Sequence, residues 1–145
     1  MSDSNKFECK KLFPYVMQFL YYYRFSSEEK KSTAGVNMLF REFNLSLGQE
    51  YTLEPDLEIS AKAKIEGIIQ NKEELISMIA PKLLKRSFES LYDIDQTILL
   101  IGCFELKKDN SAPPRALVID SMVELAKKFS TQKAPSFLNG VLDNL

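Results

Sequence analysis

The sequence predicts an all-α fold of about seven helices, arranged as two packed helical bundles. Apolar side chains recur at intervals of three and four residues between Phe13 and Phe129, which is the period of a helix with one buried face. Polar segments at Asn71 and Asp93 resemble helix starts, and the breaks between the apolar segments are short. We expect residues 1–145 to form a single domain, since this length can bury a hydrophobic core.

The first half of the chain contains three predicted helices. The first spans 13–25, with Pro14 in its first turn, where a missing amide hydrogen costs nothing. The second spans 33–47 and is expected to stop at Gly48. A loop over 48–56 then leads to the third helix, over 57–70.

The fourth and fifth helices are predicted from their polar starts. Asn71 with Glu74 three residues later is a capping-box pattern, and the helix it opens is expected to run to Leu83 or Leu84, with a kink at Pro81. Asp93-Ile94-Asp95-Gln96 looks like a second cap. The apolar run that follows would fit a buried strand by periodicity alone, but the cap and the neighbouring helices favour a central buried helix. Gly102 within it predicts close approach of another helix.

The last two helices are predicted to open at prolines. Pro113-Pro114 precedes a helix whose apolar face consists of Ile119, Met122, Ala126 and Phe129. Pro135 opens the final segment, for which two interpretations stand. Asn139-Gly140 between apolar pairs is a hairpin signal, whereas the spacing of Phe137, Val141 and Leu145 fits a helix.

Composition excludes several classes of function. Hydrophobic residues make up 45% and charged residues 27% of the chain, and the net charge is −1, so any nucleic-acid surface must be a local basic patch. The N-terminus lacks the apolar region of a signal peptide, and the longest apolar run is too short to span a bilayer. Cys9 and Cys103 suit free thiols in a reducing cytoplasm.

No catalytic, cofactor or metal site is predicted. The chain has no histidine, which removes Ser/His and Cys/His catalysis, and two cysteines make a zinc site improbable. It also lacks a GxGxxG motif, a P-loop and a paired-cysteine motif. Nothing places the carboxylates near 93–105 in a cleft, so we do not expect an enzyme. The free thiols and the missing signal peptide predict a cytoplasmic protein.

Three motifs occur in a fixed order in the second half of the chain: IDQTILLIGCFEL, PPRALVIDSMVELAKKFS and FLNGVLD. In this order and at this short spacing they resemble the NusB family of bacterial transcription antitermination factors. The resemblance implies a NusB-like fold and a helix for the FLNGVLD segment. It also implies binding of boxA-type RNA together with NusE, a small-subunit ribosomal protein, within an RNA polymerase antitermination complex that reads through terminators on ribosomal RNA operons.

The resemblance places RNA contacts near both ends of the chain. Gln18-Phe19-Leu20-Tyr21 matches the family's Q-A-L-Y box, and lysines stand where the family has an arginine-rich arm. Lysine neutralises phosphate but lacks the planar fork of arginine. FLNGVLD matches a family motif at the RNA surface, although Ser136 replaces its preceding lysine. The predicted RNA-binding residues are Lys6, Lys10, Lys11, Gln18, Tyr21, Lys133, Phe137 and Asn139.

Simpler interpretations stand beside these. The lysines of the arm also fit an ordinary solvated segment, and Tyr21 fits an interior tyrosine with a satisfied hydroxyl. Phe137 fits a core anchor of the last helix, and Asn139 a structural hydrogen-bonding residue. The run of three tyrosines cannot all face the core, since consecutive helical residues point about 100° apart.

The resemblance also implies a separate NusE-binding surface on the fifth helix, with Asp95, Phe104 and Glu105 as the predicted partner-binding residues. Asp95 alone fits a helix-end charge. Gln96 and Leu100 replace family arginines here, and Arg86 stands where a tryptophan is common. These departures, with the acidic balance, motivate a rival hypothesis: a protein–protein interaction module that keeps the fold and has lost RNA binding.

Overall fold

The computed structural model describes residues 2–28, 31, 35–46, 52–108 and 113–145. Within these ranges the chain forms seven α-helices and two short 3-10 helices, and no strand occurs, which confirms the predicted all-α class. The α-helices are α1 (Ser2–Arg24), α2 (Gly35–Ser46), α3 (Pro55–Gln70), α4 (Lys72–Ile79), α5 (Asp93–Leu106), α6 (Arg115–Phe129) and α7 (Ala134–Asp143). The 3-10 helices are η2 (Ala80–Lys82) and η3 (Phe88–Ser90).

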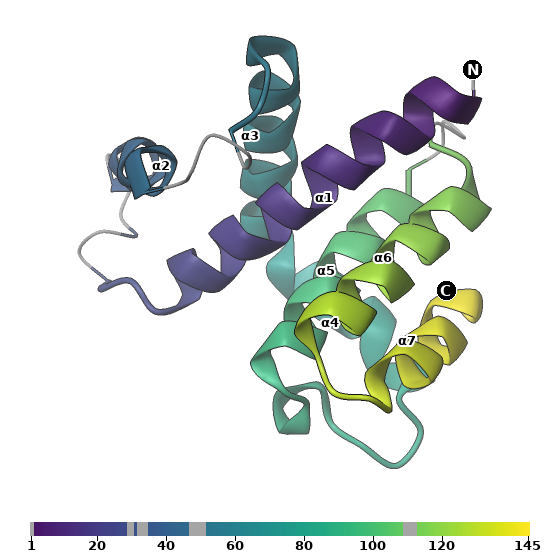
Figure 1. The fold of residues 1–145 in the computed structure, drawn as a ribbon. Helices are drawn as coiled ribbons and strands as arrows, with labels where there is room; N and C mark the ends of the chain where they lie inside the picture. The colour runs from purple at the N-terminus through teal and green to yellow at the C-terminus, as the bar shows by residue number, and fades with distance from the viewer. Residues whose placement is uncertain (1, 29–30, 32–34, 47–51, 109–112) are drawn as a thin grey trace.

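The long helix α1 joins two groups of helices (Figure 1). On one side it packs against α2 and α3, and on the other it packs against α5 and α6. Helices α4, α6 and α7 surround α5, which also contacts α3. The molecule therefore consists of two helical groups that share α1, as the sequence predicted.

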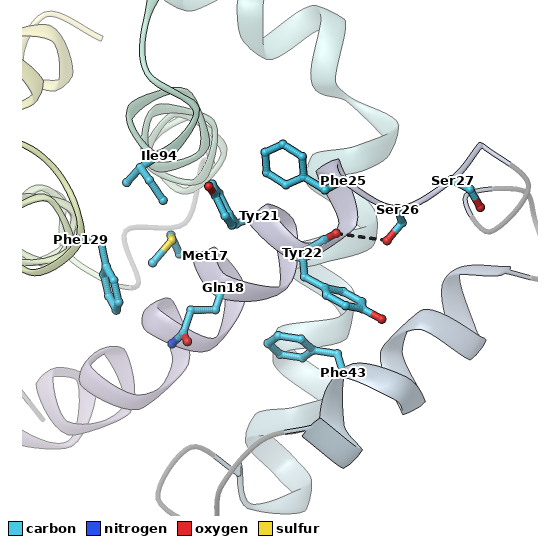
Figure 2. Close-up of a pocket in the computed structure, with 10 residues that line it drawn as sticks. All are labelled: Met17, Gln18, Tyr21, Tyr22, Phe25, Ser26, Ser27, Phe43, Ile94 and Phe129. Carbon is cyan, nitrogen blue, oxygen red and sulfur yellow. Dashed lines mark hydrogen bonds between the residues drawn. The ribbon is translucent and has the colours of Figure 1, made fainter.

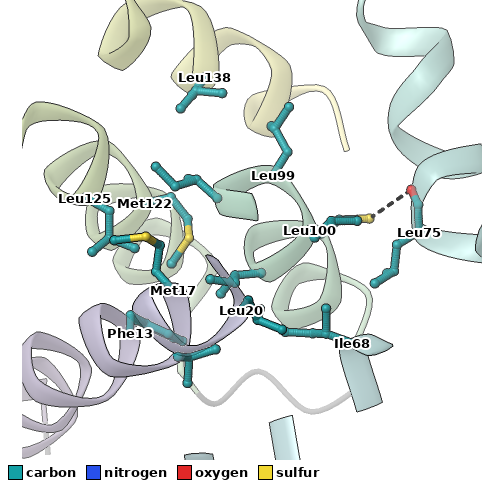
Figure 3. Close-up of a cluster of buried hydrophobic side chains, with 14 of the residues drawn as sticks. Phe13, Met17, Leu20, Ile68, Leu75, Leu99, Leu100, Met122, Leu125 and Leu138 are labelled. Carbon is teal, nitrogen blue, oxygen red and sulfur yellow. Dashed lines mark hydrogen bonds between the residues drawn. The ribbon is translucent and has the colours of Figure 1, made fainter. Parts of the chain in front are cut away.

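Helix α5 is the centre of the larger group. Every residue from Asp95 to Cys103 is buried, and the side chains of Ile98 and Ile101 are fully enclosed. Figure 3 shows apolar side chains from α1, α3, α4, α6 and α7 gathered around it. A β-carbon on Gly102 would lie 2.7 Å from Cδ2 of Leu142 and 3.2 Å from Cγ of Met122. The predicted close approach at this glycine is therefore confirmed, and it involves both α6 and α7.

The start of the first helix differs from the prediction. Helix α1 begins at Ser2, so Pro14 lies in its interior instead of its first turn. Proline there removes the hydrogen bond to the carbonyl of residue 10 and costs roughly 3 kcal/mol. Burial of Cys9, Leu12 and Phe13 offsets this cost, because the segment before and around the proline continues the apolar stripe of the helix.

Asn71 occupies the cap position before α4, as predicted, and its carbonyl oxygen accepts the backbone hydrogen bond from the Leu75 amide at 2.9 Å. Its side chain makes no cap hydrogen bond to α4, and instead Nδ2 donates to the carbonyl oxygen of Gly67 at 2.7 Å. The Asn71 backbone amide donates to the same oxygen at 3.0 Å, so the backbone and the side chain of Asn71 both close the end of α3. As expected, the helix is interrupted near Pro81, where α4 gives way to η2.

Other boundaries shift by a few residues for local reasons. Helix α3 begins at Pro55, within the predicted loop, because proline suits the first helical position. Asp93 is the first residue of α5 and pairs with Arg24 at 3.0 Å, while Tyr92 occupies the cap position. The predicted helix start at 33–34 and the segment 47–51, including the predicted stop at Gly48, lie outside the described residues.

The two C-terminal helices follow their prolines as predicted. Helix α6 starts after Pro114 and buries Ile119, Met122 and Ala126. The FLNGVLD segment is helical, so the helical interpretation is confirmed and the hairpin signal at Asn139-Gly140 was misleading. Arg115 donates from Nη2 to the carbonyl oxygens of Leu142 and Asp143, at 3.1 and 3.0 Å, which ties the start of α6 to the end of α7.

Candidate nucleic-acid interface

One stripe of α1 carries four of the predicted RNA-binding residues. Lys6, Lys10, Gln18 and Tyr21 follow one another at intervals of four, eight and three residues. Such spacing places side chains on one face of a helix. Pro14 and Phe25 complete the stripe, and its members line two neighbouring pockets. Lys11 is exposed one position off the stripe, with its ammonium 4.8 Å from the ring centre of Phe7.

The first pocket lies between α1 and α6 and has a volume of about 420 Å³. Lys6 and Lys10 line it from α1, and Lys127 and Lys128 line it from α6. Asp120 and Glu124 also line it, and Glu124 pairs with Lys127 at 3.2 Å. Four lysines against two carboxylates leave a local positive balance on a chain whose net charge is −1.

The second pocket, of about 880 Å³, is bounded by α1, the start of α5 and the end of α6 (Figure 2). Tyr21 lies at its centre in this view, between Phe25 and the pair Ile94 and Phe129. The Tyr21 side chain is 37% exposed, and its ring meets that of Phe25 edge to face, with centres 5.0 Å apart. Gln18 Nε2 donates to the carbonyl oxygen of Pro14 at 3.2 Å. The pocket thus offers exposed aromatic surface of the kind on which unpaired bases stack.

The three consecutive tyrosines of α1 have different environments, as the helical geometry requires. The Tyr22 hydroxyl donates to Glu42 on α2 at 3.1 Å, and burial followed by this contact raises the pKa of Tyr22. Tyr23 stacks on Phe19, with ring centres 6.3 Å apart. Tyr21 is the most exposed of the three and faces the second pocket.

A third pocket, of about 400 Å³, lies where the α6–α7 connection meets the start of α5. Lys133 and Phe137 line it, together with Arg86, Tyr92 and Asp95. The Arg86 guanidinium lies 4.8 Å from the ring centre of Phe137. Asn139 is exposed two residues further along α7, about 200° around the helix from Phe137, so the structure does not bring these two together.

The end of α6 and the connection to α7 link the three pockets. Lys127 and Lys128 line the first, Phe129 the second, and residues 131–133 the third. We call the surface made by the lining residues of these three pockets the α1–α6 face. Six of the eight predicted RNA-binding residues line it, whereas Lys11 and Asn139 line none of the three pockets.

The predicted partner-binding residues do not form one cluster. Asp95 and Glu105 are ten residues apart on α5, which is roughly 15 Å along the helix axis. Asp95 is buried, accepts a hydrogen bond from the hydroxyl of Ser130 at 2.5 Å, and lines the third pocket. It therefore lies among the predicted RNA-binding residues, and apart from Phe104 and Glu105.

Glu105 is enclosed at the other end of α5. Its carboxylate oxygens accept hydrogen bonds from Lys64 at 2.9 Å each and from Lys108 at 3.0 Å. Phe104 beside it is half-buried, lies under the Lys108 ammonium at 4.9 Å, and packs against Gly67 of α3. Phe104 is thus the more accessible of these two partner candidates.

Four further residues that line these pockets had no predicted RNA-binding role: Phe25, Arg86, Tyr92 and Phe129. Phe25 falls at the end of a helix and Phe129 was assigned to the apolar face of the next, so each had a structural explanation. Arg86 and Tyr92 lie in irregular segments that periodicity does not place. The tryptophan-to-arginine departure at 86 was the one available signal.

Within the described ranges the chain has neither a metal-ion cluster nor a membrane-spanning helix. No group of three or more His, Cys, Asp or Glu side chains there could hold a metal ion. None of the described helices is long and apolar enough to cross a membrane. Cys9 and Cys103 are free, buried thiols, and burial raises the pKa of Cys103 to about 11.

Comparisons with known proteins agree on one family. A sequence model described as the NusB family matches residues 14–145. The transcription antitermination protein NusB of Clostridium perfringens is 31% identical over 132 residues, covering 90% of each chain. Among solved structures, T. maritima NusB is 25% identical with a TM-score of 0.73, covering 94% of this chain and 88% of its own. A crystal structure of antitermination factors NusB and NusE in complex with dsRNA gives a TM-score of 0.68 at 21% identity, over 96% of this chain and 94% of that one, which supports the fold.

Proposed function

The chain belongs to the NusB family, and from that premise we propose that it is a transcription antitermination factor that binds boxA-type RNA together with NusE. It acts within an RNA polymerase antitermination complex in the cytoplasm, and it promotes read-through on ribosomal RNA operons. Residues 1–145 serve as one RNA-binding domain. The mechanism is assembly, without a catalytic step, a cofactor or a metal.

The observation that carries this proposal is that the end of α6 and the α6–α7 connection contribute residues to all three pockets of the α1–α6 face. Lysines at one end of the α1 stripe lead to exposed aromatic rings at the other, and the α6–α7 connection extends the surface to Lys133 and Phe137. Basic side chains neutralise phosphates, and aromatic rings stack on unpaired bases. A single-stranded RNA segment that follows the α1–α6 face would contact first the lysines and then the aromatic rings.

Within this proposal, Lys6, Lys10 and Lys133 contact phosphates, and Tyr21 and Phe137 stack on bases. Gln18 lies beside Tyr21 in the second pocket and supplies an amide for base edges. Lys11 and Asn139 line none of the three pockets, and they contribute at the edges of the α1–α6 face.

We place the NusE surface at the C-terminal end of α5, around Phe104. Glu105 acts there indirectly, because its buried carboxylate holds Lys64 and Lys108 in position. Asp95 lies at the far end of the helix, so its contribution to this surface would be to fix the start of α5 through Ser130.

A second candidate function is a protein-interaction module without RNA binding. Asp120 and Glu124 favour it, because they line the same pocket as the basic stripe and Glu124 already pairs with Lys127. In that case the α1–α6 face would dock a protein segment.

The test is a fluorescence anisotropy titration of labelled boxA-type RNA with the full chain, with and without NusE. Because lysines replace the family arginines, we expect weak binding alone and tighter binding when NusE adds its own contacts. A scrambled RNA of equal length and composition is the control. If the pair with NusE binds boxA and scrambled RNA equally weakly, the protein-interaction module becomes the better account.

A further inference from the structure

We propose that Arg86 is a further RNA-contacting residue of this chain, whose guanidinium completes, with the Phe137 ring, a stacking surface for one unpaired nucleotide in the third pocket. The inference rests on the proposed RNA-binding function and adds residues to it. Neither Arg86 nor Tyr92 is among the residues that the family resemblance implies, because the family commonly has a tryptophan at position 86. The pocket volume of about 400 Å³ lies within the range of about 300–1,000 Å³ for small-ligand sites.

Arg86 and Phe137 lie against each other in the third pocket. The guanidinium carbon of Arg86 lies 4.8 Å from the centre of the Phe137 ring, and both side chains line the pocket. A guanidinium is planar, so it stacks on bases as it stacks on aromatic rings, and it keeps donors free at its edge. Arg86 therefore supplies, in the third pocket, the planar and forked contact that the lysines of α1 cannot make.

A strained turn holds Arg86 in this position. Leu84 has a φ of 60°, in the left-handed region, and the Arg86 amide donates to the carbonyl oxygen of Leu83 at 3.3 Å. The Leu84 side chain is 91% exposed, so packing of that side chain does not account for the strain. Strain of this kind persists where the surrounding structure requires the conformation, and here it turns the chain so that Arg86 reaches Phe137.

The charges of the pocket orient the nucleotide. The Asp95 carboxylate lines it from buried α5, so a phosphate is repelled from that side. Lys133 and Arg86 are exposed and supply positive charge toward solvent, and Tyr92, at 64% exposure, adds a second aromatic surface. The base therefore points inward and the phosphate outward. A carboxylate accepts hydrogen bonds, and the exocyclic amino group of adenine, cytosine or guanine offers two donor hydrogens, where uracil has only its ring N3–H, so the pocket favours a base with an amino group.

The experiment measures affinity of the complex with NusE for boxA-type RNA in which one nucleotide at a time is abasic. Variants Arg86→Gln and Arg86→Lys are compared with Lys85→Gln, a neighbouring exposed cation that does not line the pocket. We expect Arg86→Gln to weaken binding roughly 10-fold, within the range for loss of one stacked base, and Lys85→Gln less than about 3-fold. Arg86→Lys should not restore affinity, since it keeps the charge and loses the plane.

The abasic series identifies the nucleotide. At one position, which should not be uracil, removal of the base should weaken binding to the unmodified protein and leave Arg86→Gln unaffected. Full rescue by Arg86→Lys, or no such position, would overturn the pocket while leaving RNA binding intact. Failure of the unmodified pair to bind RNA would instead overturn the proposed function and this inference with it. Unchanged urea midpoints show that the variants are folded, as expected for exposed side chains.

Discussion

The Nζ atom of Lys64 on α3 lies 2.9 Å from both carboxylate oxygens of Glu105 on α5. The Glu105 side chain is fully buried and that of Lys64 is 13% exposed, so this ion pair is removed from water. Burial lowers the pKa of Lys64, and the adjacent carboxylate opposes that change. The two groups therefore depend on each other, and they connect the two helical groups of the fold.

Removing one partner should be costly. We expect Glu105→Gln to lower the free energy of unfolding by about 3–5 kcal/mol, because Lys64 would be left buried without its counter-charge. Urea denaturation followed by circular dichroism measures this. Glu124→Gln is the control, since its pair with Lys127 is exposed on both sides and should contribute less than about 1 kcal/mol. Equal effects of the two changes would show that the buried pair is no more important than a surface one.

Two glycines within helices should respond to alanine with opposite signs. Gly102→Ala puts a methyl group 2.7 Å from a buried leucine, so we expect overpacking of about 1–3 kcal/mol to exceed the gain of about 1 kcal/mol in helix propensity. Gly140→Ala on α7 meets nothing within 4 Å and should stabilise by about 0.5–1 kcal/mol. Thermal melts of both variants decide the matter, and a stabilised Gly102→Ala would contradict the tight packing around α5.

The position of α5 predicts the effect of truncating its aliphatic side chains. Ile98→Ala and Ile101→Ala should each destabilise by about 2–5 kcal/mol, since both side chains are fully buried and each change leaves a cavity. Ile59→Ala on α3 is the matched control, because that isoleucine is 70% exposed and should change stability by less than about 1 kcal/mol. Losses below about 0.5 kcal/mol at both buried sites in urea melts would mean that α5 is peripheral.

The strained turn at Leu84 predicts a stabilising substitution. Leu84→Gly removes the β-carbon, and with it the roughly 1–2 kcal/mol that the left-handed conformation costs a residue with a side chain. Glycine adds an entropic cost of roughly 0.5–1 kcal/mol, which is smaller. We expect a small net gain in the urea midpoint. Leu84→Ala keeps the β-carbon and hence the strain, so it should be close to neutral. A destabilised Leu84→Gly alongside a neutral Leu84→Ala would indicate that the backbone here is not strained.

Much of the fold could be predicted because helical periodicity reports burial directly. The central helix α5, the apolar face of α6 and the close approach at Gly102 all follow from patterns of apolar residues. Polar residues at helix ends were less informative, since Asn71 can satisfy either the helix before it or the helix after it. The start of α1 was predicted wrongly for a similar reason. The sequence shows the cost of a proline inside a helix, but it does not show the burial that offsets this cost at Pro14.

The candidate site could be predicted only where it lies on regular elements. The α1 stripe follows from the spacing of Lys6, Lys10, Gln18 and Tyr21 along one helix. The third pocket joins Arg86, Tyr92 and Phe137 from three separate segments, and no local pattern brings these together. Asp95 and Glu105 looked like surface charges in the sequence, and their enclosure depends on helices distant in the chain.

The α1 stripe makes a prediction about salt dependence that separates charge from stacking. If Lys6 and Lys10 contact phosphates, Lys6→Gln and Lys10→Gln should each lower the slope of log K against log salt by about 0.7, the contribution of one contact on a single strand. Tyr21→Ala should weaken RNA binding by about 1–3 kcal/mol with the slope unchanged, because a stacked base releases no counterion. Affinities of folded variants for boxA-type RNA in the presence of NusE, measured across a salt series, test both statements. Lys72→Gln at the start of α4 is the control, since this lysine is exposed and lines none of the three pockets. If Lys72→Gln lowers the slope as much as Lys10→Gln does, binding depends on overall charge and the stripe has no special role.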